Sequence, residues 1–269
     1  MASLKGVYVT TKKDGSCHYR SSITFKNKHI SLGSYPSESL AHKAYTTATS
    51  ILHDGATQLD DYNEGNILPH SKWVTLHNFR DNGYYFKTPL YLFKGHFIYY
   101  LDPETHLYFD VDDLFYYSSH PIHRRGGYYF VNDYGMQLNI LGRYNIRNHA
   151  ILGKDYDFVD HNPLNLRYDN IVVHNAYHGV EIEQKENRTL YKARIHLNGN
   201  YIIGRYQDIH RAAIAYNKAV DFVSQHHISP KKFEKNYIET IDASTYQSIY
   251  KEIQLTDNLQ ALVALKKSL

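Results

Sequence analysis

Hydrophobic and polar positions alternate over three short runs near the start of the chain, and the same arrangement returns well beyond the middle. The first copy extends from Gly6 to Leu52 and the second from Gly179 to Val223. Turn-forming residues separate the runs, and alanines at helical spacing follow them, namely Ala41, Ala44 and Ala48, and Ala212, Ala215 and Ala219. Period-two alternation indicates half-buried strands, whereas this alanine spacing indicates a helix that packs closely on a sheet. Each copy is therefore predicted to form three strands and then one helix. Ser37-Glu38-Ser39 in the first copy and Asp208 in the second suit the N-terminus of that helix.

The helix covers one face of each predicted sheet, so the alternation also identifies the side chains on the open face. With Val7, Val9, Ile23, Ile30 and Leu32 predicted to point inward, the outward positions of the first copy include Tyr8, Thr10, Lys12, Arg20, Ser22, Thr24 and His29. In the second copy they are Glu181, Glu183, Lys185, Lys192, Arg194 and His196. Residues 4–53 carry seven Lys or Arg against two Asp or Glu, and residues 178–224 carry seven against five. The first copy thus has the stronger field for attracting phosphate, and a solvated surface without a ligand is the alternative for both.

The order of motifs in the two copies resembles a known family. Tyr19-Arg20-Ser21-Ser22-Ile23 aligns with Tyr191-Lys192-Ala193-Arg194-Ile195, and a Leu/Ile-Gly-x-Tyr motif and an Ala-x-x-Ala-Tyr motif follow in both. This order resembles the APETALA2-type DNA-binding domain, which lays a three-stranded sheet into the DNA major groove with a helix behind it. The resemblance implies contacts with double-stranded DNA by Tyr8, Thr10, Lys12, Arg20, Ser22 and Thr24, and by Lys185, Lys192, Arg194 and His196. The Arg and Trp contacts of the plant family are mostly replaced, so a sequence preference does not transfer.

The region between the copies has two parts. Residues 54–69 contain four acidic residues and no Lys or Arg, which predicts a linker or an extended strap. Residues 70–175 are rich in Tyr and Phe in runs separated by turn residues, which predicts β-hairpins whose aromatic side chains lie mostly in the core. A surface that stacks unpaired bases is the alternative, although ten basic residues face eleven acidic ones in this block.

The segment from Val159 to Ile171 carries the candidate chemistry. Its Asp-His pair, the following Asn-Pro-Leu and a later Asn resemble the phage-type HNH endonuclease motif, a nuclease that phage proteins often join to an APETALA2-type module. The resemblance implies His161 as general base, Asp160 as a ligand of Mg²⁺ or Mn²⁺ and Asn170 as the residue that orients the His. His174 or His178 would supply the remaining ligand. The hairpin and the final helix of the family are shortened here, so we expect the nuclease fold without its activity.

The remaining observations complete the prediction. A single cysteine, no long apolar run and no signal-peptide core predict a cytoplasmic protein without disulfides or membrane contact. The two family resemblances imply that a phage or its bacterial host encodes it. Helical spacing over residues 227–269 predicts two or three short amphipathic helices that pack on the second module or form a homodimer interface. The expected class is α+β, with modules at 1–53 and 176–226, an acidic linker at 54–69, a hairpin-rich, ββα-type HNH-like domain at 70–175 and a helical tail at 227–269.

Three functions follow from these expectations. The first is a double-stranded DNA-binding protein of phage or mobile-element type with an inactive HNH-like core. The second is a metal-dependent nicking or homing endonuclease. The third is a protein that inhibits a host nuclease or another DNA-processing enzyme, which the Tyr-rich composition of the middle block would suit.

Overall fold

The computed structural model describes residues 4–11, 17–186 and 188–267 and has the α+β class expected from the sequence. Over these ranges the strands form four three-stranded antiparallel sheets and one two-stranded sheet. The chain divides into two compact units, Met1–Ile140 with Phe158–Asn170 and Leu141–Asp157 with Ile171–Leu269. The block 70–175, predicted as one domain, contributes residues to both units. No helix in the described ranges has the length and apolar character needed to cross a membrane.

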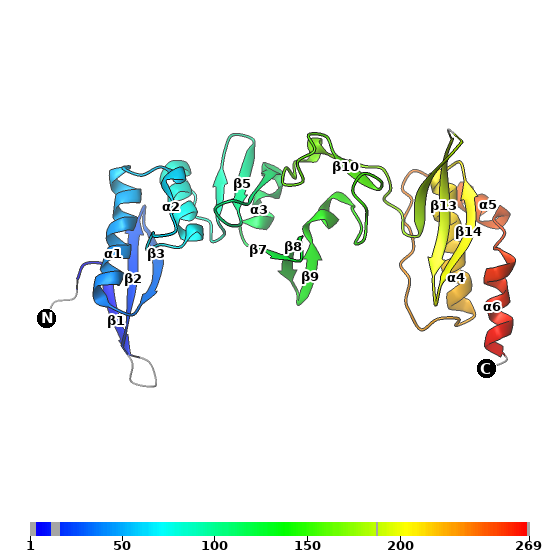
Figure 1. The fold of residues 1–269 in the computed structure, drawn as a ribbon, viewed down its shortest axis with the longest axis horizontal. Coiled ribbons are helices and arrows are strands. Elements are labelled where there is room, and N and C mark those ends of the chain that lie inside the picture. The colour runs from blue at the N-terminus through cyan, green and yellow to red at the C-terminus, as the bar shows by residue number, and fades with distance from the viewer. Residues whose placement is uncertain (1–3, 12–16, 187, 268–269) are drawn as a thin grey trace. The chain divides into compact units, whose positions relative to one another are not determined.

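The first module has the predicted three strands and helix. Strands β1 (Val7–Thr11), β2 (Cys17–Phe25) and β3 (Lys28–Tyr35) form an antiparallel sheet, and α1 (Glu38–Thr49) lies along one face of it (Figure 1). Ile23 and Ile30 of the sheet pack against Ala44 and Ala48 of the helix, which are completely buried. The hydroxyl of Ser37 accepts a hydrogen bond from Leu40 N at 3.3 Å and so caps the helix where the sequence predicted its start.

The second module repeats this construction in detail. Strands β12 (Val180–Lys185), β13 (Arg188–His196) and β14 (Asn200–Tyr206) are followed by α4 (Ile209–Gln225), which Asp208 caps. Each sheet has a β-bulge at the equivalent place, between Ser21 and Ser22 and between Ala193 and Arg194. Both copies are therefore equivalent in backbone register as well as in element order.

A glycine at the start of each module makes room for a tyrosine ring of the helix. Gly6 has φ +79° and Gly179 has φ +67°, values that residues with a side chain rarely adopt. A Cβ atom on either glycine would lie 2.0 Å from the ring of Tyr45 or Tyr216, respectively. Close packing between the start of the first strand and the helix thus explains why both copies have a Gly and a Tyr at these positions.

The core of the first module extends beyond α1. A π-helical turn (Ser50–Asp54) and a 3-10 turn (Leu59–Asp61) lead to α2 (His70–Asn82), and Leu68, Trp73, Leu76 and Phe79 join the core around Ile23. Trp73 Nε1 donates to Leu59 O at 2.9 Å. The structure therefore places residues 54–69, expected as a linker or an extended strap, against this core. Leu59, Ile67 and Leu68 anchor the segment despite its acidic charge.

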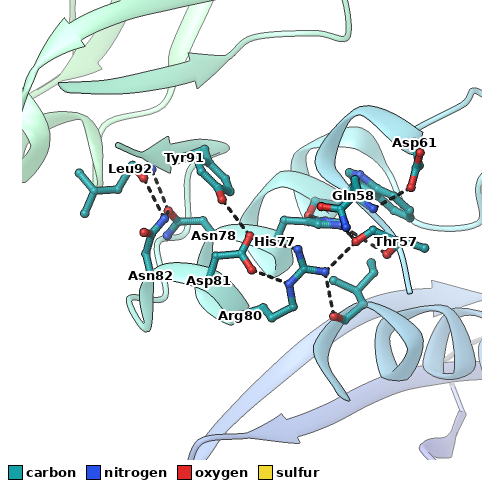
Figure 2. A network of polar contacts seen from close by, with 12 residues as sticks. Thr57, Gln58, Asp61, His77, Asn78, Arg80, Asp81, Asn82, Tyr91 and Leu92 are labelled. Carbon is teal, nitrogen blue, oxygen red and sulfur yellow. Dashed lines mark hydrogen bonds and ion pairs between the residues drawn. The ribbon is translucent and has the colours of Figure 1, made fainter. Parts of the chain in front are cut away.

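Polar side chains of α2 hold neighbouring segments in place (Figure 2). Arg80 Nη1 donates to Thr57 O at 2.7 Å, and Asn78 Oδ1 accepts from Leu92 N at 2.9 Å. Asn82 Nδ2 donates to Leu92 O at 2.9 Å, so two amide side chains bind the edge of β4 (Leu90–Leu92). The sequence pattern predicted hairpins from residue 70 onward, whereas the chain first forms this helix.

The next two sheets have the predicted hairpins. The first contains β4, β5 (His96–Tyr100) and β6 (His106–Asp110), and it leads through a 3-10 turn (Val111–Asp113) to α3 (Leu114–Tyr117). The second contains β7 (Ile122–Arg125), β8 (Tyr128–Asp133) and β9 (Met136–Asn139). Phe97, Phe109 and Tyr117 are completely buried, which confirms an aromatic core for the first of these sheets. Tyr128 and Tyr134 of the second are 65% and 96% exposed.

The remaining elements belong largely to the second unit. A 3-10 turn (Ile140–Tyr144) precedes β10 (Tyr156–Phe158), and another (Tyr168–Asn170) precedes β11 (Ile171–Val173), which pairs with β10. The tail forms α5 (Ala243–Glu252) and α6 (Asp257–Lys267). Ile253 and Leu259 of the tail are buried in the same core as α4, which confirms the predicted packing on the second module. The predicted homodimer stays a prediction.

Candidate nucleic-acid interface and nuclease-like loop

The face of the first sheet opposite α1 is open, and Tyr8 and Arg20 are neighbours on it. Tyr8 of β1 is directly across from Arg20 of β2, and Ser34 of β3 is across from Arg20 on the other side. Tyr8 is 58% exposed, and Arg20 is also exposed. In the part of the chain that the structure describes, Arg20 has no ion-pair partner. An uncompensated guanidinium beside an exposed aromatic ring can bind phosphate oxygens or the edge of a base.

The other predicted contact residues of this face differ in accessibility. Thr24 is exposed, and its hydroxyl lies 3.5 Å from His29 Nδ1. The hydroxyl of Thr10 donates to His18 O at 3.1 Å. Ser22 was expected to be accessible but is only 8% exposed, because this short side chain lies in the central strand between the neighbouring strands. Val9 was expected to point inward but is 54% exposed, on the edge strand β1. Lys12 lies outside the described residues.

The corresponding face of the second sheet carries paired charges. Glu181 of β12 accepts from Lys192 Nζ at 2.8 Å and from Arg194 Nε at 2.5 Å. Glu183 accepts from Arg205 Nε at 2.6 Å. Lys192 and Arg194, which are predicted to bind DNA, thus form ion pairs with an acidic side chain of the same sheet. The face therefore presents much less free positive charge than its basic residues alone suggest.

Lys185 and His196 are also predicted to contact DNA, and they lie at the ends of β12 and β13. Asn200 Oδ1 accepts from Arg194 Nη1 at 2.6 Å and lies 2.9 Å from His196 Nδ1. Arg194 is thus held from two sides, by Glu181 and by Asn200. Lys185 is exposed at the end of β12.

The electrostatics of Glu181 and Glu183 agree with this geometry. Partial burial raises the pKa of Glu181, but the hydrogen bonds from Lys192 and Arg194 outweigh it and hold that pKa below its usual value. The hydrogen bond from Arg205 likewise lowers the pKa of Glu183. Both carboxylates therefore remain charged well into acidic pH.

Residues 159–170, whose sequence resembles the HNH motif, form a loop against the edge of β6, called the nuclease-like loop below. Tyr108 N donates to Leu164 O at 2.9 Å, and Leu166 N donates to Tyr108 O at 2.8 Å. The buried side chain of Asn170 accepts from Asp160 N at 2.9 Å and donates to Asn165 O at 2.8 Å. Asn170 therefore supports the backbone of the loop, and its amide group makes these contacts rather than one with the ring of His161.

Asp160 and His161 lie together at the exposed turn of this loop. Asp160 Oδ1 accepts from Asn162 N at 2.8 Å and Oδ2 accepts from Asn165 Nδ2 at 2.7 Å. The hydrogen bond from Asn165 is the main reason that the pKa of Asp160 is lowered. His161 is exposed and has the left-handed φ of +60°, which is uncommon for a residue with a side chain.

The predicted metal ligands have partners of their own. His174 Nε2 lies 3.0 Å from Asp157 Oδ2, and His178 Nε2 lies 3.4 Å from Glu234 Oε2. Burial is the main reason that the pKa of His178 is lowered. Across the described ranges, no three His, Cys, Asp or Glu side chains gather as a cation would require.

Sequence reasoning missed three residues that shape these sites. Asn165 joins Asp160 and Asn170, Arg205 neutralises Glu183, and Asn200 positions Arg194. Alternation along β14 could have found Arg205, because it lies directly across from Lys192 in the sheet. Asn165 gave no comparable signal, since its partners depend on the conformation of the whole loop.

Comparisons with protein-family models, with curated proteins and with solved structures find no match for this chain.

Proposed function

We propose that this chain binds double-stranded DNA through the open face of its first sheet and that its nuclease-like loop does not cut DNA. In this proposal the two modules are APETALA2-like and the region between them is HNH-like. One observation carries the proposal, namely that Tyr8 and Arg20 are neighbours on an exposed sheet face with α1 on the opposite side. A sheet supported from behind can enter the major groove with its open face toward the bases.

Charge supports duplex DNA as the ligand. Residues 4–53 have a net charge of +5, against +3 for the whole chain, so the positive field is concentrated in the first module. Contacts with phosphates release bound counterions, and the resulting affinity falls as salt rises. Arg20 supplies such a contact because no acidic partner within the described residues competes for it.

The second module is proposed to contribute less to affinity. Glu181 already holds Lys192 and Arg194, so contacts between DNA phosphates and these cations must replace existing ion pairs. Lys185 and His196 remain exposed on its strands. Because both modules belong to one chain, even a weak second contact raises the overall affinity through effective concentration.

The absence of cleavage is proposed from the hydrogen bonds of the loop. Both oxygens of Asp160 accept hydrogen bonds from Asn162 and Asn165, and the amide of Asn170 is used by the backbone. In the HNH-type mechanism these residues would instead hold a cation and orient a His.

Band-shift titrations of the full chain on duplex DNA over a salt series test binding. Arg20→Ala is expected to weaken binding and to reduce the salt slope by about one. Lys43→Ala is the matched control, because Lys43 is an exposed cation on α1, behind the sheet. If the wild-type chain fails to retard duplex DNA at low salt, the proposal is wrong.

A metal-dependent endonuclease is the second candidate. It is favoured by the exposed ring of His161 next to Asp160 on a strained backbone, where a general base is accessible to substrate. Plasmid nicking in the presence of Mg²⁺ or Mn²⁺ distinguishes the candidates. Cleavage by the wild type that His161→Ala abolishes would establish the enzyme, whereas equal cleavage by both proteins would exclude this site.

A further inference from the structure

The small sheet β7–β8–β9 has two unlike faces. On one face, Ile122 and Val131 are buried, and Ile122 N donates to the hydroxyl of Tyr99 at 3.0 Å, which ties β7 to β5. Arg124 belongs to this face and lies 3.5 Å from Asp102 and 3.3 Å from the hydroxyl of Thr105. This face is therefore attached to the neighbouring part of the first unit, around β5. On the opposite face the side chains of His123, Arg125 and Tyr128 are exposed.

The opposite face combines aromatic, cationic and amide side chains. Arg125 lies across from Tyr128, and His123 lies across from Phe130. By strand alternation the complete set is His123, Arg125, Tyr128, Phe130, Asn132, Gln137 and Asn139. None of these side chains is acidic. In residues 70–175 as a whole, acidic and basic residues nearly balance. The register of this sheet nevertheless leaves one face without acidic side chains, which composition does not reveal.

The aromatic rings of this face are arranged together with its cations. The guanidinium carbon of Arg125 lies 5.5 Å from the ring centre of Phe130, and the ring of His123 lies 5.6 Å from it at an interplanar angle of 33°. Arg125 Nη1 also donates to Gln137 Oε1 at 3.2 Å. Tyr128 is 65% exposed at the end of the same row. Arg125 is thus held above the sheet, and most of its donors have no partner among the residues that the structure describes.

We propose that this face, defined by Arg125, Tyr128 and Phe130, binds single-stranded nucleic acid. Unpaired bases stack on the exposed ring of Tyr128, Phe130 supports Arg125 from below, and Arg125 contacts the phosphates. Stacking suits unpaired bases because their ring faces are accessible, whereas in a duplex they are covered by neighbouring bases. The amides of Asn132 and Gln137 can donate to and accept from base edges. The lack of acidic groups on the face favours a polyanionic strand over a protein partner.

This inference does not depend on duplex binding by the first module, because it rests on a different sheet. Fluorescence anisotropy of the full chain with a labelled oligo(dT) strand tests it. An abasic deoxyribose-phosphate strand of the same length carries the same charge without bases, so the ratio of the two affinities measures stacking. A strand of oligo(rU) distinguishes DNA from RNA as the source of the bases.

The matched variants separate the two faces of the sheet. Tyr128→Ala is expected to lower oligo(dT) affinity at least about fivefold and to remove most of the preference over the abasic strand. Arg125→Ala should weaken both strands. Arg124→Ala removes the neighbouring cation on the attached face, and Tyr237→Ala removes an 82% exposed Tyr of the tail, and neither should change the ratio. Circular dichroism confirms that each variant is folded.

Three outcomes would overturn the inference. The wild type could bind the abasic strand and oligo(dT) equally, Tyr128→Ala could keep the full preference for bases, or Arg124→Ala could reduce binding as much as Arg125→Ala. A preference for bases that Tyr128→Ala removes supports it, whether the tighter strand is oligo(dT) or oligo(rU).

Discussion

Replacing Gly6 with alanine is expected to destabilise the first module by about 2–5 kcal/mol. Gly6 has φ +79°, and a left-handed conformation costs a residue with a Cβ atom about 1–2 kcal/mol. The new Cβ would also lie 2.0 Å from Cδ2 of Tyr45, so the ring or the strand must move. Overpacking of this kind adds about 1–3 kcal/mol. The two terms act on the same position and therefore add to a first approximation.

The only tryptophan of the chain makes this change measurable. Trp73 is buried in the core that contains Ile23 and Ala44, so its fluorescence during urea titration follows the unfolding of the first module. With a urea m-value of about 1–3 kcal/mol per molar, the expected destabilisation moves the midpoint by at least about 0.7 M.

Two control substitutions separate strain from overlap. Gly55 has φ +61°, and no atom lies within 4 Å of the position that a Cβ would take there, so Gly55→Ala introduces backbone strain alone. Gly179→Ala introduces both terms in the second module and should leave the Trp73 transition in place. If Gly6→Ala shifts the Trp73 midpoint no further than Gly55→Ala does, the proposed overlap with Tyr45 is refuted.

The remaining predictions concern pH, the loop and the second sheet. Burial lowers the pKa of His77 below its ordinary value of 6.5, so the unfolded chain binds more protons than the folded one just below that pH. Stability should therefore fall as the pH drops below 6.5, and His77→Gln should lose less stability than the wild type when urea unfolding is compared above and below that value. Asn170→Ala leaves Asp160 N and Asn165 O without partners and should lower the free energy of local unfolding of the loop by about 1–3 kcal/mol. The expected readout is faster hydrogen exchange of the Asp160 amide, and unchanged exchange would contradict the role assigned to Asn170. Glu181→Gln removes the ion pairs with Lys192 and Arg194, although Asn200 still holds Arg194. It should therefore tighten duplex binding and steepen its salt slope by about one, whereas Glu64→Gln makes the same change in net charge and should not.

Local signals in the sequence were sufficient to predict the two modules. Alternation identified the strands, the alanine spacing identified α1 and α4, and Ser37 and Asp208 marked their starts. These features depend on residues close together in the chain, so they can be recognised without knowledge of the fold. The concentration of positive charge in the first copy is likewise a property of sequence alone.

The helix α2 and the packing of residues 54–69 were not predictable in the same way. The buried face of α2 includes Trp73, Leu76 and Phe79, but also His77 and Asn78, so its hydrophobic pattern is weak. Polar groups are tolerated there because residues 54–69 and β4 provide partners for them, such as Thr57 O for His77 and Leu92 N for Asn78. Those partners are defined only after the chain has folded.

The sequence by itself thus determined the repeat and the set of residues that alternate onto the open face of each sheet. Only the tertiary structure decided which of those residues are free. Strand register places Glu181 beside Lys192 and Arg194 but leaves Arg20 beside Tyr8, and the position of the nuclease-like loop on β6 directs Asn165 to Asp160. The physical reason is that a charge or an amide acts through its partners in space, and pairing between strands and loops joins residues whose spacing along the chain carries no signal.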